Sequence, residues 1–401
     1  MAVMTDRYDV AVIGLGAMGS ATLSELARRG RRAIGFDRFT PPHAFGSSHG
    51  ETRIIREAYF EHPLYVPLVQ RAYALWAALE RRSGRLLLAP TGGLMIGAAD
   101  TSLVAGALRS ARTHGLAHDV LTAEEIRRAY PAMRIPDAMI GVREPRAGVL
   151  FPERGIDTFL RLAIEDGADV RVDARVTSWT ADARGVTIDA VMGDAASGGG
   201  ERMRCEADQI VLSCGPWMKS MAPDLGLPLS VERTVLHWFE PRARADRFQS
   251  GRFPIFLLED DRGHVLYGVP EMPGVGVGAD VGAGVKVALH HHGEQTTGDA
   301  VRREVSAEEV REIAELAPAY FPDLAGGWRR AAVCMYTNMP DGHFLIDRHP
   351  RHDAVWIVSP CSGHGFKFAP VIGELVADLV SGRPAPFDLA PFRLDRGTAS
   401  R

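Results

Sequence analysis

Three glycines close to the N-terminus are spaced as in a turn that binds the phosphates of a dinucleotide. They are Gly14, Gly16 and Gly19, and they follow the apolar run Tyr8–Ile13. Gly14 allows a tight turn, Gly16 lets the backbone approach a pyrophosphate, and Gly19 lets the following helix pack on the strand. Asp37, which follows the next apolar run, can accept a hydrogen bond from a ribose hydroxyl. The spacing therefore predicts a dinucleotide site and leaves open whether NAD or FAD binds there.

A cysteine without an evident partner lies near the C-terminus. Cys334 stands in the run AAVCMYT, which predicts a short apolar strand that ends in a turn. The four cysteines of the chain, at positions 205, 214, 334 and 361, form no CxxC pair. This usage predicts reduced thiols, and neither a zinc site nor a disulfide framework. Cys334 is then either a small buried hydrophobe or a thiol with a chemical role.

Lysine is scarce in this chain. The 46 basic residues include only Lys219, Lys286 and Lys367, and all the others are arginine. An ammonium group is a compact charge that can lose its proton, whereas a guanidinium keeps its charge. Each lysine is therefore a candidate for a role that arginine does not fill, although chance survival explains any one of them equally well.

Three consecutive histidines, His290 to His292, suggest a metal site at first sight. Neighbouring residues on a strand point to opposite faces, so only the outer two could share one ion. No acidic residue or thiol stands beside them in the sequence. We therefore expect no metal.

Length and composition exclude several classes of protein. With 401 residues, 46% of them apolar, the chain is long enough for two domains or for one large domain with an inserted second one. A formal charge of -4 and the lack of a dense basic block argue against nucleic acid or an anionic membrane as a partner. No apolar run is long enough to span a bilayer, and the N-terminus enters a strand without a signal peptide, so we expect a cytoplasmic location.

Hydrophobic periodicity predicts the elements that must position these groups. The glycine turn leads into an amphipathic helix over Ser20–Gly30 and a second strand at Ala33–Phe36. The polar segment 41–59 predicts a long loop, exposed unless it covers a ligand. Residues 65–82 predict a helix with one apolar face.

The remaining two thirds of the chain alternate between predicted sheet and helix. Short strands are expected between residues 170 and 215, and more sheet between 230 and 290. Ser306 and Glu309 form a capping-box pattern that opens a helix through about Leu316. The strand Ala354–Val358, a glycine-rich turn and a helix end the chain, and this unit can return to the first domain and complete the cofactor site.

Several blocks of the sequence together resemble a known family. The segments SSHGETRIIREAY, AAVCMYTNMPDGHFLIDRHP and SGHGFKF, with the N-terminal GLGAMG, are similar to those of monomeric sarcosine oxidase and N-methyltryptophan oxidase. These are flavoenzymes that oxidise secondary amino acids. The resemblance runs from the first strand to the C-terminal helix.

The resemblance implies a mixed α/β and α+β fold in two domains. A Rossmann-like FAD-binding domain, discontinuous in sequence, is expected to comprise residues 1–85, 148–222 and 322–401. A sheet-rich substrate domain is expected to comprise residues 86–147 and 223–321. The family is monomeric, so we expect a monomer that acts on a small-molecule substrate and dioxygen.

The resemblance also implies that FAD is attached covalently. The family links the flavin to a cysteine of the CMYT block, which is Cys334 in this sequence, through an 8α-S-cysteinyl thioether. A single thiolate needs no CxxC partner for this reaction, which agrees with the isolated position of Cys334. Cys361 is the competing thiol, but its neighbours do not match the attachment motif.

Charged residues of the matching blocks receive roles from the same resemblance. Arg56 and Lys367 match the pair that binds the substrate carboxylate, although Arg56 could instead form a salt bridge with Glu51 or Glu57. Lys286 matches a lysine that helps dioxygen to accept electrons.

The remaining assignments concern the flavin, the substrate amine and the rest of the cofactor. Arg53 and His49 are expected beside the flavin, and His290 near the substrate amine. Further contacts with the cofactor are assigned to Arg38, Ser47, Gly215, Gly363, His364, Gly365 and Lys367.

The sequence departs from the family at two places near the substrate. Sarcosine oxidases carry a tyrosine pair where this chain has Leu266 beside Tyr267, which predicts a more apolar pocket. The glycine-rich segment Glu271–Val285 is also longer than usual, and it could form a mobile lid or a rim that admits a larger amine. The expected substrate is therefore a secondary or N-methyl amino acid of unassigned side chain and stereochemistry.

Three functions compete on these grounds. The first is an oxidase that passes electrons from the amino acid through FAD to dioxygen, with hydrogen peroxide, an aldehyde and an amine as products. The second is an FAD-dependent dehydrogenase or demethylase that feeds a quinone or a protein carrier. The third is a flavin-binding sensor without catalysis. Lys286 favours the first.

Overall fold

An apolar strand, a glycine turn and a helix open the fold, as the fingerprint predicts. The computed structural model describes residues 7–193, 200–272 and 283–396. The first strand, β1 (Arg7–Ile13), runs parallel to β2 (Ala33–Phe36), and α1 (Ala17–Arg28) connects them. The helix begins three residues earlier than predicted because it starts inside the glycine turn itself.

The first of two large sheets grows from this unit. Besides β1 and β2, its strands within the described residues are β9 (Asp169–Arg171), β10 (Ala174–Asp182), β11 (Gly185–Met192), β12 (Glu201–Leu212), β19 (Leu345–His349) and β20 (His352–Ser359). The central strands β9, β2, β1, β12 and β20 are parallel and lie side by side in that order, and β10 and β11 add an antiparallel flank to β12.

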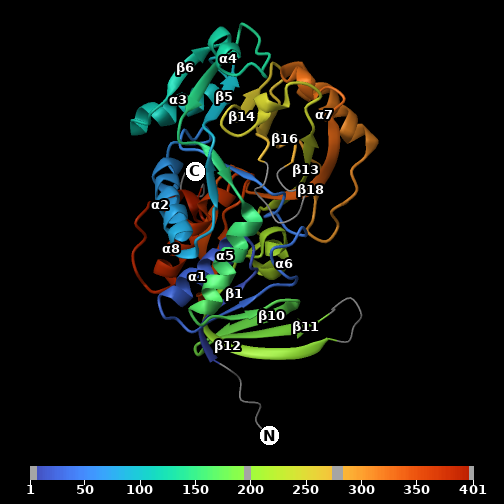
Figure 1. Cartoon of the computed structure of the whole chain (residues 1–401). Helices are drawn as coiled ribbons and strands as arrows, with labels where there is room; N and C mark the ends of the chain where they lie inside the picture. The colour runs from blue at the N-terminus through green and yellow to red at the C-terminus, as the bar shows by residue number, and fades with distance from the viewer. Residues whose placement is uncertain (1–6, 194–199, 273–282, 397–401) are drawn as a thin grey trace.

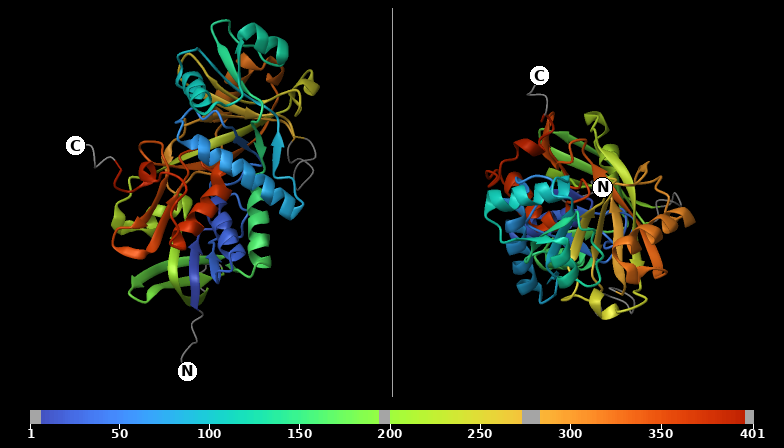
Figure 2. Two further views of the ribbon diagram at one scale, coloured as in Figure 1. Left: turned by 90° about the vertical axis from the view of Figure 1, so that its left-hand side faces the viewer. Right: turned by 90° about the horizontal axis from the view of Figure 1, so that it is seen from above.

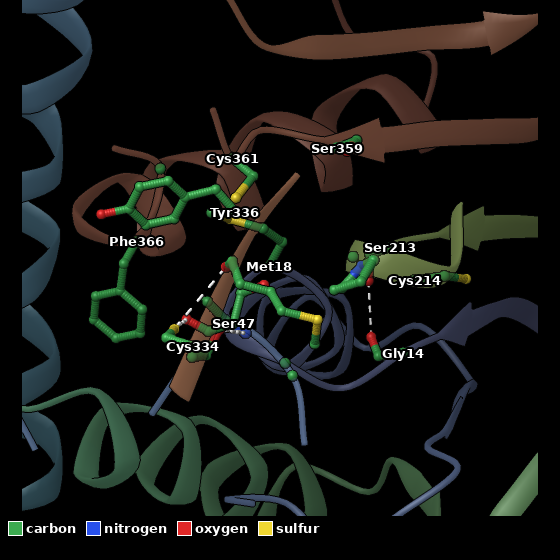
Figure 3. Close-up of a pocket in the computed structure, with 18 of the residues that line it drawn as sticks. Gly14, Met18, Ser47, Ser213, Cys214, Cys334, Tyr336, Ser359, Cys361 and Phe366 are labelled. Atoms are coloured by element: carbon green, nitrogen blue, oxygen red, sulfur yellow. Dashed lines mark hydrogen bonds between the residues drawn. The ribbon is translucent and has the colours of Figure 1, made fainter. Parts of the chain in front are cut away.

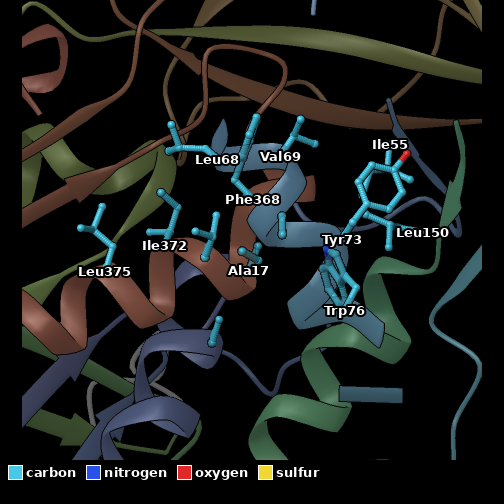
Figure 4. Packing of buried hydrophobic residues seen from close by; sticks show 14 of the residues in the cluster. Ala17, Ile55, Leu68, Val69, Tyr73, Trp76, Leu150, Phe368, Ile372 and Leu375 are labelled. Carbon is cyan, nitrogen blue, oxygen red and sulfur yellow. The ribbon is translucent and has the colours of Figure 1, made fainter. Parts of the chain in front are cut away.

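Helices bury one face of this sheet. α1 and α5 (Pro152–Glu165) contact its strands, α8 (Ala369–Val380) packs on α1, and α2 (Tyr65–Ser83) packs on α8, while the short α6 (Met218–Met221) follows β12. The predicted apolar stripe of α2 packs here: Val69 lies beside Phe368 (Figure 4), and the Trp76 ring packs against Phe159 and Phe366. Burying a large aromatic side chain stabilises the fold by roughly 1.5–3 kcal/mol. The same packing fixes the turn before α8.

The second sheet forms the other end of the molecule (Figures 1 and 2). Its nine strands, counted over the described residues, are β5 (Gly93–Gly97), β6 (Asp119–Thr122), β7 (Ile140–Glu144), β13 (Ser230–Phe239), β14 (Ile255–Glu259), β15 (Val265–Val269), β16 (Val285–His290), β17 (Gln295–Thr296) and β18 (Trp328–Asn338).

Three helices accompany this sheet: α3 (Ser102–His114), α4 (Ala123–Ala129) and α7 (Ala307–Tyr320). The capping box that opens α7 is confirmed, because the Ser306 hydroxyl accepts from the Glu309 N–H and the Glu309 carboxylate accepts from the Ser306 N–H. None of the described helices is long and apolar enough to cross a membrane.

The strand that carries Cys334 belongs to the second sheet. β18 runs antiparallel to β13, with Cys334 opposite Thr234. The predicted domain boundary at residue 322 assigns β18 to the domain of the first sheet. The pairing with β13 places β18 in the second sheet instead. Partners about 100 residues apart are selected by tertiary packing, which local sequence does not reveal. The other predicted boundaries stay predictions.

The polar segment 41–59 folds over the junction of the two sheets. Its only described strand, β3 (Arg53–Ile55), pairs with β8 (Gly148–Leu150), which also pairs with β4 (Leu88–Pro90). His49, Thr52 and Arg56 of this segment are all buried. The segment is therefore not an exposed loop. It covers an internal site, which is the second of the two possibilities predicted from the sequence. Residues 273–282, most of the glycine-rich segment for which a lid or rim is predicted, lie outside the described residues.

The glycine turn yields a test of how the two glycines differ. A Cβ on Gly19 would lie 1.8 Å from the Gly14 carbonyl oxygen, whereas a Cβ on Gly16 would meet only the Ser48 Oγ at 3.7 Å. We expect Gly19→Ala to lower the free energy of unfolding by about 1–3 kcal/mol or more, because backbone must move. Gly16→Ala should cost at most about 1 kcal/mol. Urea unfolding of both variants measures the difference, and equal losses would contradict this account.

Candidate active site

Segments from both sheets line one cavity of about 620 Å³. Most of the residues predicted from the sequence contribute to its wall: Gly14, Gly16, Asp37, Arg38, Ser47, Arg53, Arg56, Gly215, Tyr267, Lys286, His290, Cys334, Gly363, His364, Gly365 and Lys367. The structure therefore brings together groups from the first 60 residues, the second sheet and the C-terminal turn.

Three predicted residues lie elsewhere. Gly19 packs against the Gly14 carbonyl inside the turn, and His49 is buried beside Cys334. Leu266 is fully buried in the apolar cluster that contains Phe256 and Phe321, on the face of β15 opposite to Tyr267. The prediction that Leu266 contacts substrate is therefore wrong, because neighbours on a strand face opposite sides of the sheet.

One end of the cavity is formed by the glycine turn and the ends of parallel strands. The Asp37 carboxylate accepts from the Leu15 N–H at 2.7 Å and from the Phe39 N–H at 2.9 Å, which fixes it at the end of β2. The Ser213 hydroxyl donates to the Gly14 carbonyl at 2.8 Å and holds the turn against the end of β12 (Figure 3). Arg38 pairs with Asp299, which lies between β17 and α7 and was not predicted from the sequence.

The Cys334 thiol lies among cationic groups. Its Sγ lies 3.4 Å from both Arg53 Nη2 and the Ser47 carbonyl oxygen, so a thiol can donate to Ser47 and a thiolate can accept from Arg53 (Figure 3). Burial acts to raise the pKa of Cys334, but the charges of His49 and Arg53 and a hydrogen bond from His49 lower it to about 6. The group is therefore mostly a thiolate at neutral pH.

The competing thiols are in different surroundings. Cys361 also lines the cavity and accepts from the Thr337 N–H at 3.3 Å, but burial raises its pKa. Cys214 lies behind the glycine turn, and burial together with the charge of Asp37 raises its pKa further. Among the thiols at the cavity, Cys334 is the one whose pKa is lowered, and it is therefore the best nucleophile of the three.

Arg56 has an internal partner that the sequence did not reveal. Its Nη2 donates to both carboxylate oxygens of Glu61 at 2.7 Å. The partners considered from the sequence are engaged elsewhere, Glu51 with Arg330 and Glu57 with Arg146. Glu61 also lines the cavity. Burial acts to raise its pKa, but the charges of Arg56, His364 and Lys367 lower it to about 2, so the carboxylate stays ionised.

Lys286 is enclosed between β16 and the polar segment. Only 2% of the residue is exposed, and its Nζ donates to the carbonyl oxygens of Thr52 at 2.6 Å and Gly50 at 3.1 Å. Burial and the charge of Arg53 lower the pKa of Lys286 well below its ordinary value. The lysine therefore sits at the cavity as an easily deprotonated group.

The three histidines at the end of β16 have three different partners. His290 faces the cavity and lies 3.4 Å from the Tyr336 hydroxyl, while His291 pairs with Glu232 and His292 with Glu312. Burial lowers the pKa of His290 well below its ordinary value, so the ring is neutral.

Comparison with known proteins identifies the family. A family model described as FAD dependent oxidoreductase matches residues 9–379. The chain belongs to this family. FAD is therefore the dinucleotide that the fingerprint left open.

Individual relatives of this FAD-dependent oxidoreductase cover nearly its whole length. Monomeric sarcosine oxidase of Streptomyces avermitilis is 41% identical over 377 residues, which are 94% of this chain and 94% of that protein. N-methyl-L-tryptophan oxidase of Salmonella arizonae is 36% identical over 396 residues, 97% of this chain and 99% of that protein.

Solved structures agree in fold at lower identity. Glycine oxidase from Geobacillus kaustophilus superimposes with a TM-score of 0.77 at 22% identity, over 98% of this chain and 99% of that chain. The open form of NikD, an amino acid oxidase of nikkomycin biosynthesis, gives a TM-score of 0.82 at 22% identity, over 97% and 98%. These two likenesses concern the fold.

The cavity of the FAD-dependent oxidoreductase fits its cofactor. Ser47, Thr52 and Ser359 line it, and their hydroxyl oxygens are buried without a hydrogen-bond partner among the described residues. Buried polar groups are normally satisfied, so these three hydroxyls indicate a polar ligand. Gly16, the N-cap residue of α1, has no side chain to accept from the first turn, where free N–H groups favour an anion such as a diphosphate. The glycine turn and Asp37 would thus hold the nucleotide at one end of the cavity, and Cys334 lies at the other end of the cavity.

The charge on Cys334 can be tested by alkylation of protein prepared without flavin. With a pKa of about 6, roughly nine-tenths of this thiol is ionised at pH 7, so iodoacetamide should modify it with a pH midpoint near 6. Replacing the adjacent cation, Arg53→Met, should move the midpoint upward. Peptide mass spectrometry reads the site, and Cys214 and Cys361, whose pKa values are raised, should stay unmodified. A midpoint at pH 8 or above would exclude the thiolate.

Proposed function

We propose that this FAD-dependent oxidoreductase is an oxidase of secondary amino acids, N-methylated or cyclic. The observation that carries the proposal is the enclosure of Arg56, Lys367 and Lys286 in the cavity that also holds the FAD cradle. Sarcosine oxidase and N-methyl-L-tryptophan oxidase, the relatives named above, support this substrate class. The proposal includes a cytoplasmic monomer, which rests on the sequence alone.

Arg56 and Lys367 would bind the carboxylate of the substrate. Both are buried, Arg56 with 2% and Lys367 with 5% of its surface exposed, and a charge-assisted hydrogen bond of this kind contributes about 1.5–3 kcal/mol. Glu61 already pairs with Arg56, so an incoming carboxylate must compete with it or displace it. A ligand therefore needs a carboxylate group that can replace Glu61 at Arg56.

Orientation of the amine falls to neutral groups. FAD, when bound, accepts the hydride equivalents of the C–H bond next to nitrogen and passes the electrons on. The chain must hold that bond at the ring with the nitrogen lone pair free. His290, a neutral ring at the cavity, and Tyr267 would orient the amine. The resulting imine hydrolyses to an aldehyde and an amine.

The identity of the electron acceptor depends on Lys286. When it is protonated, Lys286 is a cation held by two carbonyl oxygens in a buried site, and in that form it would stabilise the negative charge that develops on dioxygen as it is reduced to hydrogen peroxide. Arg53, half-buried in the same wall, would stabilise negative charge on the reduced ring. These two cations favour the oxidase over the alternative, a dehydrogenase or demethylase that passes electrons to a quinone or a protein carrier.

Cys334 would attach the flavin as an 8α-S-cysteinyl thioether. The proposal is supported by the lowered pKa of Cys334 and by its place in the cavity wall beside Arg53 and His49. Joining the thiol to the methyl group would release two electrons and two protons, for which dioxygen would be the final acceptor. Attachment therefore needs the same access for oxygen as turnover.

Anaerobic mixing followed by air tests the function. Sarcosine, N-methyl-L-tryptophan and L-proline are mixed with the holoenzyme, and at least one should bleach the flavin. Air should then restore the colour with one equivalent of hydrogen peroxide. We expect Lys286→Met to slow recolouring roughly 10²–10³-fold while bleaching changes little, because one electrostatic stabiliser is lost.

The control for this experiment is the third lysine, Lys219, which is exposed and does not line the cavity. Lys219→Met should leave both half-reactions unchanged. Slow recolouring of the unmodified enzyme without peroxide would support the dehydrogenase instead. Failure of every secondary amino acid to bleach the flavin would leave only the non-catalytic sensor.

Acid precipitation tests covalent attachment. The precipitate of the unmodified protein should keep its yellow colour, and Cys334→Ser should release the colour into the supernatant. Cys361→Ser is the matched control, since it removes a cavity thiol with a raised pKa and should leave the flavin attached. Colour retained by Cys334→Ser would assign the linkage to another residue.

A further inference from the structure

Two hydrogen bonds hold the end of the Lys367 side chain. Its Nζ donates to the carbonyl oxygen of His364 at 2.7 Å and to the hydroxyl oxygen of Tyr59 at 3.2 Å. The backbone is fixed as well, because Trp76 Nε1 donates to the Lys367 carbonyl at 2.8 Å. The side chain is buried and reaches the cavity wall. Its position is therefore set before any substrate enters.

The hydrogen bonds beyond Tyr59 have one possible direction. His364 Nε2 lies 3.0 Å from the Gly342 carbonyl oxygen, which can only accept, so Nε2 carries the hydrogen. Burial, with the charges of Lys367 and Arg56, lowers the pKa of His364 to about 4, so the ring is neutral and its Nδ1 accepts. The Tyr59 hydroxyl lies 2.7 Å from Nδ1 and 3.3 Å from the His364 carbonyl oxygen; both can only accept, and the hydroxyl donates to the nearer Nδ1. The tyrosine oxygen is then left as an acceptor for Lys367.

This arrangement uses two N–H groups of Lys367. A neutral amine has two N–H groups and one lone pair, whereas an ammonium has three donors. With both acceptors satisfied, the third direction at Nζ is the one available to a ligand in the cavity. The carboxylate of Glu61, which could have stabilised an ammonium, forms its ion pair with Arg56.

The surroundings of Lys367 make its neutral form accessible at neutral pH and predominant above it. Burial is the largest influence, followed by Arg56, and together with Arg53 they lower the pKa of Lys367 to about 7 against the opposing charge of Glu61. The other groups in contact do not titrate near neutrality: Glu61 has a pKa of about 2, His364 of about 4, and that of Tyr59 is raised well above its ordinary value.

We propose that Lys367 is a neutral amine in the resting enzyme and takes the ammonium proton of the incoming amino acid. The inference rests on the proposed function and deepens it. One N–H bond of the substrate ammonium breaks, and one N–H bond forms at the lone pair of Nζ. The substrate nitrogen gains the lone pair that oxidation requires, and Lys367 becomes the cation that faces the substrate carboxylate. Tyr59 and His364 are positioning residues for this transfer.

Binding of a carboxylate that has no ammonium group tests the resting charge of Lys367. Butanoate is titrated into the oxidised holoenzyme between pH 6 and 9, with the flavin spectrum as readout. Butanoate brings no proton, so its binding must draw one from solution. We expect its Kd to rise about tenfold per pH unit above pH 7, since only the ammonium form binds it. Lys367→Arg, whose charge is permanent, should show a Kd independent of pH.

Two further variants separate Lys367 from its surroundings. Lys286→Met removes the other buried lysine of the cavity and should keep the slope. Tyr59→Phe removes one acceptor of Nζ and should move the midpoint of the slope, whereas a purely structural role would change Kd at all pH values alike. A Kd for the unmodified enzyme that stays constant from pH 6 to 9 would overturn the inference.

Flavin reduction by an N-methyl amino acid gives a second readout. The reduction rate constant divided by Kd should be flat between about pH 7 and 9 in the unmodified enzyme. In Lys367→Arg it should rise about tenfold per pH unit, because only substrate that has already lost its proton in solution reacts. Matching profiles for the two proteins would overturn the inference.

These outcomes are distinguishable from failure of the proposed function. If butanoate does not bind at any pH, the carboxylate site itself is wrong and both proposals fall. If butanoate shows the expected slope but no secondary amino acid reduces the flavin, the proposed function fails, and with it the transfer from substrate. In both cases the lysine titration and the activity are measured separately.

Discussion

The burial of positive charge beside an apolar core is the constraint on which this site depends. Arg53, Arg56, Lys286 and Lys367 all reach one cavity, and the carboxylate of Glu61 forms its ion pair with Arg56. An ion removed from water needs compensation. The protein supplies it through backbone carbonyls for Lys286 and Lys367, through the thiolate of Cys334 for Arg53, and through Glu61 for Arg56. The two arginines are thus compensated by anionic groups, whereas the two lysines are held by neutral acceptors.

The difference between lysine and arginine becomes meaningful under this constraint. A buried guanidinium stays charged and must be paired, as Arg56 is. A buried ammonium can instead give up its proton, and the two lysines of the cavity are held by neutral acceptors. Two of the three lysines, Lys286 and Lys367, therefore stand at buried sites where a group that can lose its charge is suitable. Lys219, which is exposed, has no such explanation.

Local pattern predicted the elements that recur over a few residues. The glycine turn, the strand before it, the apolar face of α2 and the capping box of α7 each depend on near neighbours, and each is confirmed. The position of Leu266 could have been corrected from the sequence, because a strand that turns Tyr267 to the cavity must turn its neighbour away. The partner of Arg56 could not, since Glu61 follows it in an irregular segment where no regular spacing relates the two side chains. The membership of β18 in the second sheet likewise depends on contacts between distant residues.

The pairing of β18 with β13 has a consequence for how the molecule holds together. The glycine turn that would hold the nucleotide end of FAD belongs to the first sheet, whereas Cys334 stands on a strand of the second. A flavin joined to Cys334 would therefore act as a cross-link between the two halves, anchored by phosphate contacts at one end and by a covalent bond at the other. The attachment reaction can then proceed only after the halves have docked. The bond would thus be present only in molecules whose halves have docked correctly, and it would keep the halves together through each catalytic cycle.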